Sequence, residues 1–222
     1  MAIPDLGNIA AAVGALGAAS FALVDATKIG RNGGVSHSGF TFIEAGVRQL
    51  MPDHQETKLL GVLHSNWING APLGDQKAIA KSLLKLRLTP ATAESFAKAT
   101  SVDAGVLRAV ATSMVNGDDL THPQVNALGR FDLALTAALD DAYQHADQRY
   151  RNAAKVLAAV VAVVLALLGG WAMWEGDATF FGSQQMWVSI MCGLLAIPLA
   201  PVSKDLTSAL AAGVKVAQAI KR

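Results

Sequence analysis

The stretch that decides the fold is Val156–Trp174, VLAAVVAVVLALLGGWAMW. Its 19 residues contain no charged side chain, and a helix of about 20 apolar residues is long enough to cross the hydrocarbon core of a bilayer. Trp171 and Trp174 stand at its end, and tryptophan favours the headgroup level of a membrane. A buried helix of a large soluble protein has a similar composition, but a chain of 222 residues is too small to surround one. We therefore predict a membrane span here.

Met186–Ser203 is a second apolar run, with Trp187 at its start and Pro198 and Pro201 near its end. Membrane helices tolerate interior prolines where neighbouring helices satisfy the carbonyl groups that lose their hydrogen bonds. Because only a short linker separates this run from Trp174, the two spans are predicted to form a helical hairpin.

A third uncharged run, Ile9–Val24, is rich in alanine and glycine. A secretory signal peptide has a similar apolar segment, but it begins with a positively charged region, and no Lys or Arg precedes Lys28. Small residues recur along the run at helical spacing, and such small-xxx-small patterns allow helix backbones to approach closely in lipid. We predict a span that packs against other helices through Ala10, Gly14 and Ala18.

The positive charges give the predicted spans an orientation. Lys and Arg are absent before Lys28 and between Lys155 and Lys204, and fourteen of the 18 lie from Lys28 through Lys155. Positive residues stay on the cytoplasmic side of membrane proteins. We therefore expect the N-terminus outside, a cytoplasmic middle region, an outside loop after the second span and a cytoplasmic C-terminus. This multipass arrangement fits a bacterial inner membrane.

The middle region contains helical patterns separated by turn signals, and no convincing run of alternating β-branched residues. These helices are predicted to form a cytoplasmic domain over residues 29–122. Prolines, glycines and capping residues set their expected limits: Thr41–Leu50, Gln55–Ile68, Asp75–Leu86 with Asp75 as N-cap, a helix starting at Thr89–Pro90, and one starting at Ser101 or Asp103 and ending at Asn116–Gly117.

No glycine–proline break interrupts the chain from Pro123 to Trp174. Apolar residues recur there at steps of three and four and form one stripe: Leu128, Phe131, Leu135, Leu139, Ala142, Ala146 and Tyr150. We predict a single helix over residues 123–174, about 78 Å long at 1.5 Å per residue, that continues from the cytoplasm into the second span. The alternative is two helices with a bend near the membrane surface.

The last segment, residues 204–222, is predicted to be a cytoplasmic C-terminal helix. Leu206, Leu210 and Gly213 begin a spacing that is typical of a coiled-coil seam. The pattern covers only two heptads, and its residues are small, which suits close packing around an axis. We therefore add these three positions to the predicted helix-packing residues.

Composition excludes several classes of protein. The chain is 52% hydrophobic and 16% charged, against roughly 45–50% and about 25% in average globular proteins, and this apolar content excludes intrinsic disorder. Cys192 is the only cysteine, so a disulfide scaffold is excluded. A net charge of +1 disfavours nucleic-acid binding through bulk charge.

Residues 85–117 are similar in rhythm to the helical core of winged-helix DNA-binding domains. Residues 89–116, however, contain two basic and two acidic side chains, whereas DNA affinity needs several phosphate contacts from Lys and Arg. We therefore predict a packed helical bundle in this region and no nucleic-acid partner.

Lys77, Lys81 and Lys85 recur every four residues and form a positive stripe on one predicted helix. The ordinary interpretation is a helix face in contact with water. The functional interpretation is contact with lipid headgroups, because a basic residue near an anionic membrane surface contributes roughly 1 kcal/mol of attraction. Membrane lipids are therefore among the partners that we expect.

Asp141 and His145 lie four residues apart on one helix face, and they are a candidate metal pair if a second copy completes the ligands. An i,i+4 polar pair facing water is the simpler interpretation. No phosphate loop, dinucleotide fingerprint, nucleophile elbow or zinc-protease motif occurs in the sequence. We therefore expect no catalytic residue, no cofactor and no enzymatic activity.

These patterns predict an all-α integral membrane protein with about three transmembrane helices and a helical cytoplasmic domain between the first and second. The expected segments are residues 1–28 (first span), 29–122 (cytoplasmic domain), 123–174 (long helix entering the membrane), 175–203 (outside loop and third span) and 204–222 (C-terminal helix).

The expected function follows from this architecture and from the lack of ionisable residues within the spans, which disfavours ion-coupled transport. We expect a non-enzymatic homo-oligomer that serves as a scaffold or a passive pore. The alternatives are a membrane-permeabilising effector of the holin or toxin type, and a membrane-tethered module that binds an unidentified cytoplasmic protein.

Overall fold

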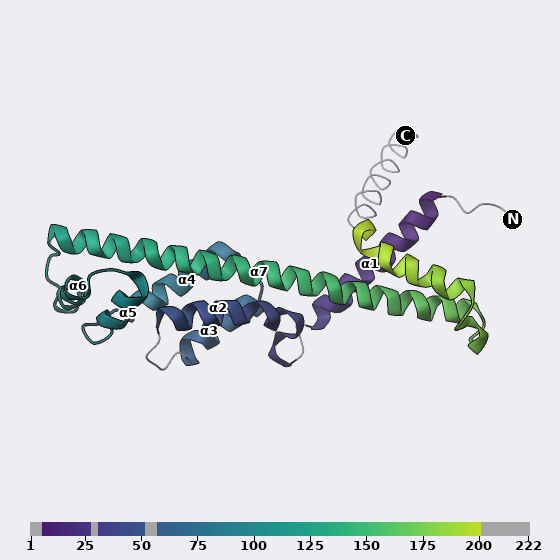
Figure 1. Cartoon of the computed structure of the whole chain (residues 1–222), viewed down its shortest axis with the longest axis horizontal. Helices are drawn as coiled ribbons and strands as arrows, with labels where there is room; N and C mark the ends of the chain where they lie inside the picture. Colours follow the sequence, from purple (N-terminus) through teal and green to yellow (C-terminus); the bar gives the residue numbers. More distant parts are fainter. Residues whose placement is uncertain (1–5, 28–30, 52–56, 201–222) are drawn as a thin grey trace, which may run out of the picture. The chain divides into compact units, whose positions relative to one another are not determined.

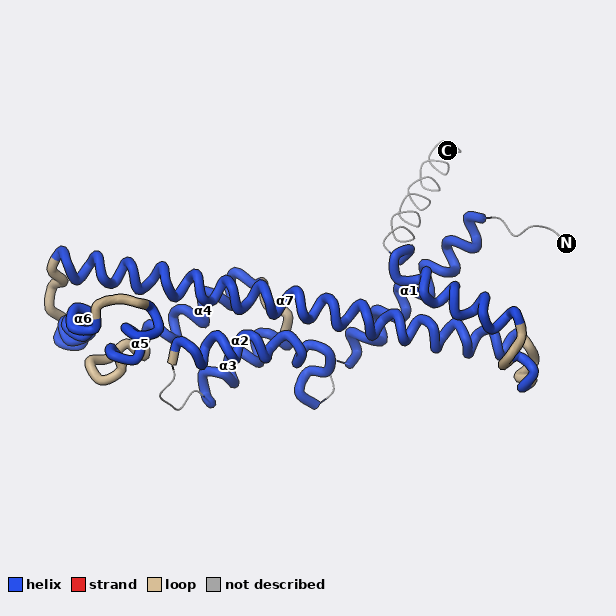
Figure 2. The backbone as a smooth tube through the Cα atoms, in the orientation of Figure 1, coloured by secondary structure: helices blue, strands red, loops and turns tan. Residues whose placement is uncertain are grey.

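The computed structural model describes residues 6–27, 31–51 and 57–200. Within these residues all regular structure is helical and no strand occurs, which confirms the predicted all-α fold (Figure 1 and Figure 2). The α-helices are α1 (Leu6–Ala26), α2 (His37–Leu50), α3 (Thr57–Ile68), α4 (Leu73–Lys85), α5 (Ala93–Thr100), α6 (Ala104–Asn116) and α7 (His122–Met173). A further apolar helix covers Gln184–Ala200, and 3-10 helices cover Arg31–Ser36 and Ala178–Phe180.

The chain forms two compact units. The terminal unit contains residues 1–35 and 151–222, and the central unit contains residues 36–150. Helix α7 contributes its first part to the central unit and its last part to the terminal unit.

Helix α7 runs without interruption over 52 residues, from His122 to Met173. At its start, the backbone N–H of Thr121 donates a 2.7 Å hydrogen bond to Gln124 Oε1, which is one half of a capping box. Pro123 lies in the first turn, where its missing N–H costs no hydrogen bond. The single helix that the sequence predicts over residues 123–174 is confirmed, and each end agrees within one residue.

The central unit is built around large apolar side chains. In this unit α2 to α6 lie along the first part of α7 (Figure 1), and the predicted apolar stripe of α7 forms one wall of the core. Phe96 of α5 and Phe131 of α7 meet edge to face with ring centroids 5.4 Å apart. The largest fully buried side chains include Ile43, Leu63, Leu84, Phe96, Leu107, Phe131, Leu135, Leu139 and Tyr143. Large apolar residues inside and polar residues outside are the distribution of a helical domain in water.

Two glycines of α2 allow it to approach α7 closely. A Cβ atom at Gly39 would lie 2.6 Å from the carbonyl oxygen of Ala146, and one at Gly46 would lie 2.7 Å from Ala142 Cβ. The start of α2 is held by Trp67 of α3, whose Nε1–H donates a 2.8 Å hydrogen bond to the Ser36 carbonyl. This helix therefore begins at His37, four residues before the predicted Thr41.

Two further predicted helix starts in the central unit are wrong. Helix α4 begins at Leu73 after Pro72, so Asp75 is not the N-cap but lies in the first turn, where the helix dipole favours a carboxylate. Helix α5 begins at Ala93 rather than at Thr89–Pro90. The hydroxyl of Thr92 accepts a 2.9 Å hydrogen bond from the Thr89 N–H and donates a 2.6 Å bond to the Arg87 carbonyl, and these bonds close a separate turn before the helix.

The predicted limits of α6 are confirmed. Asp103 is its N-cap, and the carboxylate Oδ1 accepts a 2.8 Å hydrogen bond from the Val106 N–H. The helix ends at Asn116, followed by Gly117 with φ of 78°, a left-handed conformation that glycine adopts without strain.

Candidate functional site

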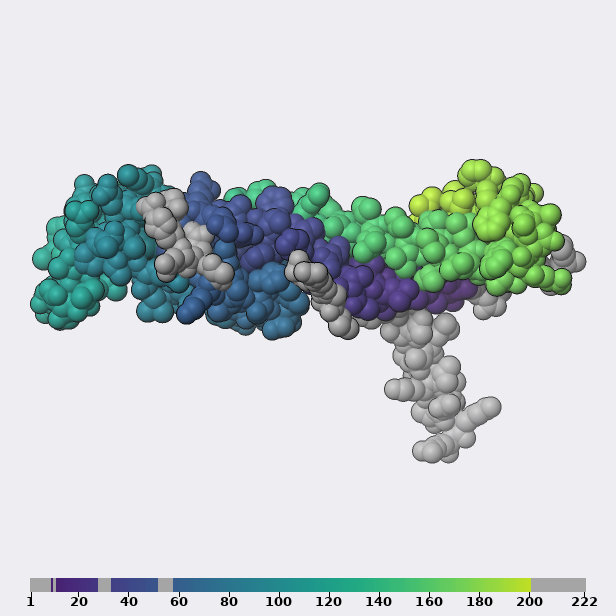
Figure 3. Space-filling model, turned by 90° about the horizontal axis from the view of Figure 1, so that it is seen from below, coloured from purple at the N-terminus to yellow at the C-terminus, as the bar shows by residue number. Residues whose placement is uncertain are grey.

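The terminal unit exposes its large apolar side chains. The apolar surface is formed by the last part of α7 and the helix Gln184–Ala200, which are green to yellow in Figure 3. It contains Val156, Val160, Val164, Leu168, Val188, Met191, Leu194 and Leu195, each about half exposed or more. Only 11% of the most apolar 18-residue window of α7 is buried. Monomeric proteins in water rarely expose a continuous apolar surface of this kind.

The same unit buries small residues. Apart from Val24, the buried positions of its α-helices within the described residues are Gly, Ala or Ser: Gly14, Gly17, Ser20, Ala158, Ala162, Gly193, Ala196 and Ala200. A Cβ atom at Gly17 would overlap the carbonyl oxygen of Ala196, and one at Gly193 would lie 2.5 Å from Val163 Cα. Glycine is therefore required at both helix crossings, and close contact through small residues is typical of helix pairs in membranes.

The predicted packing residues of α1 fall into two groups. Gly14 is buried, but Ala18 is exposed, so the two do not share the face that packs within the chain. That face is Gly14, Gly17, Ser20 and Val24, with steps of three, three and four. The predicted residues recur at steps of four only. Because an α-helix has 3.6 residues per turn, such a row winds around the helix and leaves the line of contact with a straight neighbouring helix. The side chain of Ala10, and Leu206, Leu210 and Gly213, lie outside the residues whose structure is described.

Gly17 and Gly193 were not among the predicted helix-packing residues, although the sequence contains a signal for both. Both glycines lie inside uncharged runs, where a helix-interior glycine costs about 1 kcal/mol relative to alanine. Such a cost is tolerated where a neighbouring backbone leaves no space for a methyl group. The partner of each glycine depends on the three-dimensional packing and is not visible in the sequence.

Aromatic residues lie at the end of α7 and in the loop that follows. The indole Nε1–H of Trp174 donates a 3.3 Å hydrogen bond to the Thr179 hydroxyl. Asp177 caps the 3-10 helix by accepting a 2.7 Å bond from the Thr179 N–H, and this hydrogen bond lowers the pKa of the Asp177 carboxyl. Amphipathic rings at the end of an apolar helix suit a membrane–water interface.

Comparisons of the chain with protein-family models, with curated proteins and with solved structures found no match. The residues and their geometry are therefore the basis for assigning a function.

The lysine stripe of α4 has carboxylate partners on α7. Lys77 Nζ lies 2.6 Å from Asp140 Oδ1, while Lys81 and Lys85 lie 3.2 Å and 2.8 Å from the two oxygens of Asp132. The hydrogen bond from Lys85 is the largest cause of the lowered pKa of Asp132. These ammonium groups are half-buried against α7 and pair with acidic residues inside the central unit, and their contact with lipid headgroups stays a prediction.

The basic residues of α5 and α6 also have acidic neighbours. Glu94 lies 3.3 Å from Arg108 and 3.7 Å from Lys98, between the Oε and N atoms concerned. The faces of these helices that carry Phe96 and Leu107 are buried in the core. The two helices are thus part of the packed bundle that the sequence predicts.

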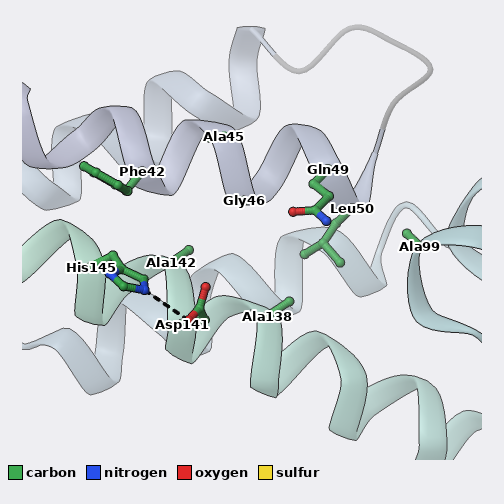
Figure 4. A pocket seen from close by; sticks show the side chains of 10 residues that line it. All are labelled: Phe42, Ala45, Gly46, Gln49, Leu50, Ala99, Ala138, Asp141, Ala142 and His145. Atoms are coloured by element: carbon green, nitrogen blue, oxygen red, sulfur yellow. Dashed lines mark ion pairs between the residues drawn. The ribbon is translucent and has the colours of Figure 1, made fainter.

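A groove in the central unit contains the Asp141–His145 pair. The groove lies between α2 and α7, and Figure 4 shows both side chains at its edge, with Phe42 beside His145. Its volume is about 370 Å³, and small residues such as Gly46 and Ala142 form its floor. His145 Nε2 lies 3.4 Å from Asp141 Oδ1, and both side chains are more than half exposed.

No third metal ligand accompanies the Asp141–His145 pair in the part of the chain that the structure describes. Among the described residues, no group of three His, Cys, Asp or Glu side chains is arranged to hold a metal ion. The ring of Phe42 stacks on His145 with centroids 6.1 Å apart. Within one chain, Asp141 and His145 form an i,i+4 polar pair that faces water.

Tyr143 of α7 brings a hydroxyl group into the core of the central unit. The residue is 1% exposed, and its Oη has no hydrogen-bond partner among the described residues. Burial raises the pKa of this phenol. The ring contacts Trp67 edge to face, with centroids 6.5 Å apart.

The unpaired hydroxyl makes Tyr143→Phe a stabilising substitution. A buried polar group without a partner costs about 1–3 kcal/mol, so we expect the variant to raise the free energy of unfolding of the central unit by about 1 kcal/mol. Tyr150→Phe is the control, because Tyr150 is only half-buried and should gain nothing. Amide hydrogen exchange of α3 and α7 peptides measures the difference, and faster exchange in Tyr143→Phe would contradict it.

Proposed function

We propose that the chain is a non-enzymatic, multipass membrane protein that assembles as a homo-oligomer and serves as a scaffold or a passive pore. The observation that carries the membrane assignment is the distribution of residue sizes in the terminal unit. Small residues are inside and Val, Leu, Met and Trp are outside, whereas the central unit has the opposite arrangement. Each distribution lowers the free energy of its unit only in its own solvent, lipid for the first and water for the second.

The lengths of three helices support three spans. The uncharged stretch Val156–Trp174 would be about 28 Å long as a helix, close to the hydrocarbon thickness of roughly 30 Å. Helix α1, with 21 residues, is about 31 Å long. The apolar helix Gln184–Ala200 reaches about 25 Å and follows α7 after a short loop, as expected for a hairpin.

The charge distribution supports a cytoplasmic central unit, and cysteine labelling tests this orientation. In a chain with Cys192→Ala, we expect Ala178→Cys to react with a membrane-impermeant maleimide on intact cells. Asp118→Cys, in the loop before α7, should react only after lysis. Both positions are exposed, so the fold itself leaves both introduced cysteines accessible to the reagent.

Two outcomes of the labelling would contradict the proposal. The reverse pattern would overturn the orientation. Equal labelling of both positions before lysis, together with release of the chain from membranes at alkaline pH, would overturn the membrane assignment itself.

The exposed face of α1 supports self-assembly. Ala11, Ala15, Ala18 and Ala22 are all exposed and recur at steps of four, three and four. Alanines on a lipid-facing surface allow a second helix to approach closely, and interhelical association in lipid depends on such close packing. Identical chains most often close into symmetric assemblies, so a second copy is the expected partner for this face.

Native mass spectrometry of the detergent-extracted chain tests the assembly. We expect an oligomeric parent and a smaller particle for Ala15→Leu with Ala18→Leu, because the added side chains separate the α1 helices by more than the few ångströms over which packing is favourable. Gly169→Leu is the control, since a Cβ atom at this position has no neighbour within 4 Å. A monomeric parent, or an unchanged mass for the α1 variant, would exclude assembly through this face.

A further inference from the structure

A second groove of the central unit lies between the first turn of α6 and the start of α7. Its volume is about 860 Å³, at the upper end of the range of ligand pockets. Its apolar lining includes Val102 and Val106 on one side, and Pro123 and Val125 on the other. Val125 is 52% exposed. The chain itself therefore leaves this apolar surface open.

Two consecutive residues of α7 in this groove have no partner among the described residues. A Cβ atom at Gly129 would meet no atom within 4 Å, so no neighbouring helix requires glycine there, although glycine is unfavourable inside a helix. Arg130 is exposed and forms no ion pair in the described part of the chain. The carboxylate of Asp103, which also lines the groove, already caps α6. The groove thus offers close access to a helix backbone beside a free cation.

The outward face of α4 has the complementary chemistry. It lies opposite the buried residues Gln76, Ala80 and Leu84, and Ile79 and Leu86 on it are 37% and 79% exposed. A helix face in water usually carries charged and polar side chains, but this face has a single charge, the carboxylate of Asp75, which forms no ion pair with any described residue. The outward face consists of Asp75, Ala78, Ile79, Ser82 and Leu86.

We propose that the outward face of α4 in one copy of the chain docks in the groove at the start of α7 in a second copy. Asp75 pairs with Arg130, and the small side chain of Ala78 lies over Gly129. Ile79 contacts the apolar lining, as the anchors of one helix face do when a helix binds in a groove. In a closed symmetric assembly every copy supplies one such face and one such groove.

This proposal rests on the proposed self-assembly. One helix face is small beside the roughly 800 Å² per partner that a stable interface buries. The α1 contact holds the copies together, and it thereby raises the effective concentration of one central unit at the other. The opposite charges of the outward face and the groove then select which surfaces of the two central units meet.

Cross-linking between two full chains with different affinity tags tests the contact. Both chains carry Cys192→Ala, one also carries Ala78→Cys and the other Val125→Cys, and they are co-expressed and extracted in mild detergent. We expect a short bismaleimide to give a product that bears both tags. Ala45→Cys in place of Ala78→Cys is the control, because Ala45 is an exposed alanine of α2, and it should give no more product than chains without an added cysteine.

Charge reversal tests the ion pair between the copies. Asp75→Arg in the first chain, or Arg130→Glu in the second, should lower the yield of doubly tagged product by about fivefold or more, because like charges then meet at the contact. The two reversals together restore an opposite pair and should restore the product. A chain that had simply failed to fold would not be rescued by a change in the other chain.

Gly129→Leu tests the groove without changing a charge. The leucine side chain fills the groove, but its Cβ atom meets no atom of its own chain within 4 Å, so the helical circular dichroism should stay parental. We expect the yield to fall as strongly as with Arg130→Glu. An unchanged yield would show that α4 does not enter the groove.

The outcomes separate this contact from the proposed function. If native mass spectrometry shows an oligomeric parent but no doubly tagged product forms, a second copy is excluded as the occupant of the groove and the assembly through α1 stands. A product that the paired reversal fails to restore also excludes the contact. If the parent is monomeric, both proposals are wrong.

Discussion

Gly193→Leu is expected to destabilise the terminal unit by about 3 kcal/mol or more, because overpacking of a tight contact forces backbone shifts. A Cβ atom at this position would lie 2.5 Å from Val163 Cα and 2.9 Å from Val163 N, and neither backbone atom can rotate away. The helix Gln184–Ala200 would have to separate from α7 to admit the new side chain. Detergent-titrated unfolding, followed by circular dichroism, measures the loss.

Gly169→Leu provides the matched control for this prediction. Gly169 is also a glycine inside an apolar helix, but it is exposed and a Cβ atom there meets no atom within 4 Å. The substitution should leave the unfolding midpoint unchanged or raise it slightly, since leucine has the higher helix propensity. Equal midpoints for the two variants would show that the helices do not cross at Gly193.

The features that the sequence predicts well are those that depend on one segment at a time. The limits of α7 follow from an uninterrupted apolar stripe and from the lack of a break, and both are properties of consecutive residues. The capping of α6 by Asp103 and its end at Gly117 follow from local hydrogen bonding and backbone conformation. These elements form for the same reason in any tertiary context.

The sequence does not predict which segments pack against each other. The spacing of Lys77, Lys81 and Lys85 is visible in the sequence, but their partners on α7 lie 47 to 63 residues further along the chain. Several acidic residues are equally available by sequence distance, and only the packing of α4 on α7 selects Asp132 and Asp140. The same limit applies to α1: a pattern of small residues indicates that close approach is possible, but not which side of the helix packs within the chain.

In the membrane protein that we propose, the terminal unit lies in lipid and the central unit lies in water. In the central unit, folding removes large apolar side chains from water, and the free energy gained is about 25 cal/mol per Å² of apolar area. In the terminal unit the exposed side chains are already apolar, so a lipid solvent provides no comparable drive. Its stability depends on close contacts at Gly17, Gly170 and Gly193. Substitutions at glycine should therefore have their largest effects in the terminal unit, and truncations of large side chains in the central unit.

Phe131→Ala tests the expected effect of truncating a large side chain in the central unit. Phe131 is 0% exposed and packs edge to face on Phe96, so its truncation leaves a cavity and is expected to cost about 3–5 kcal/mol. Leu133→Ala, two residues along the same helix, is the control, because Leu133 is 70% exposed and such surface changes stay within about 0.5 kcal/mol.

Hydrogen exchange of the full chain in detergent distinguishes the two units in this experiment. Because Phe131 connects α7 to α5, amides of α5 and α6 should exchange faster in Phe131→Ala by a factor of roughly a hundred or more, which corresponds to the expected loss of about 3 kcal/mol or more. Amides of the helix Gln184–Ala200 should keep the parental rate, since this helix is stabilised by contacts within the terminal unit. Equal acceleration in both units would mean that they unfold as one cooperative body, and the different roles assigned to glycine and to large side chains would then be wrong.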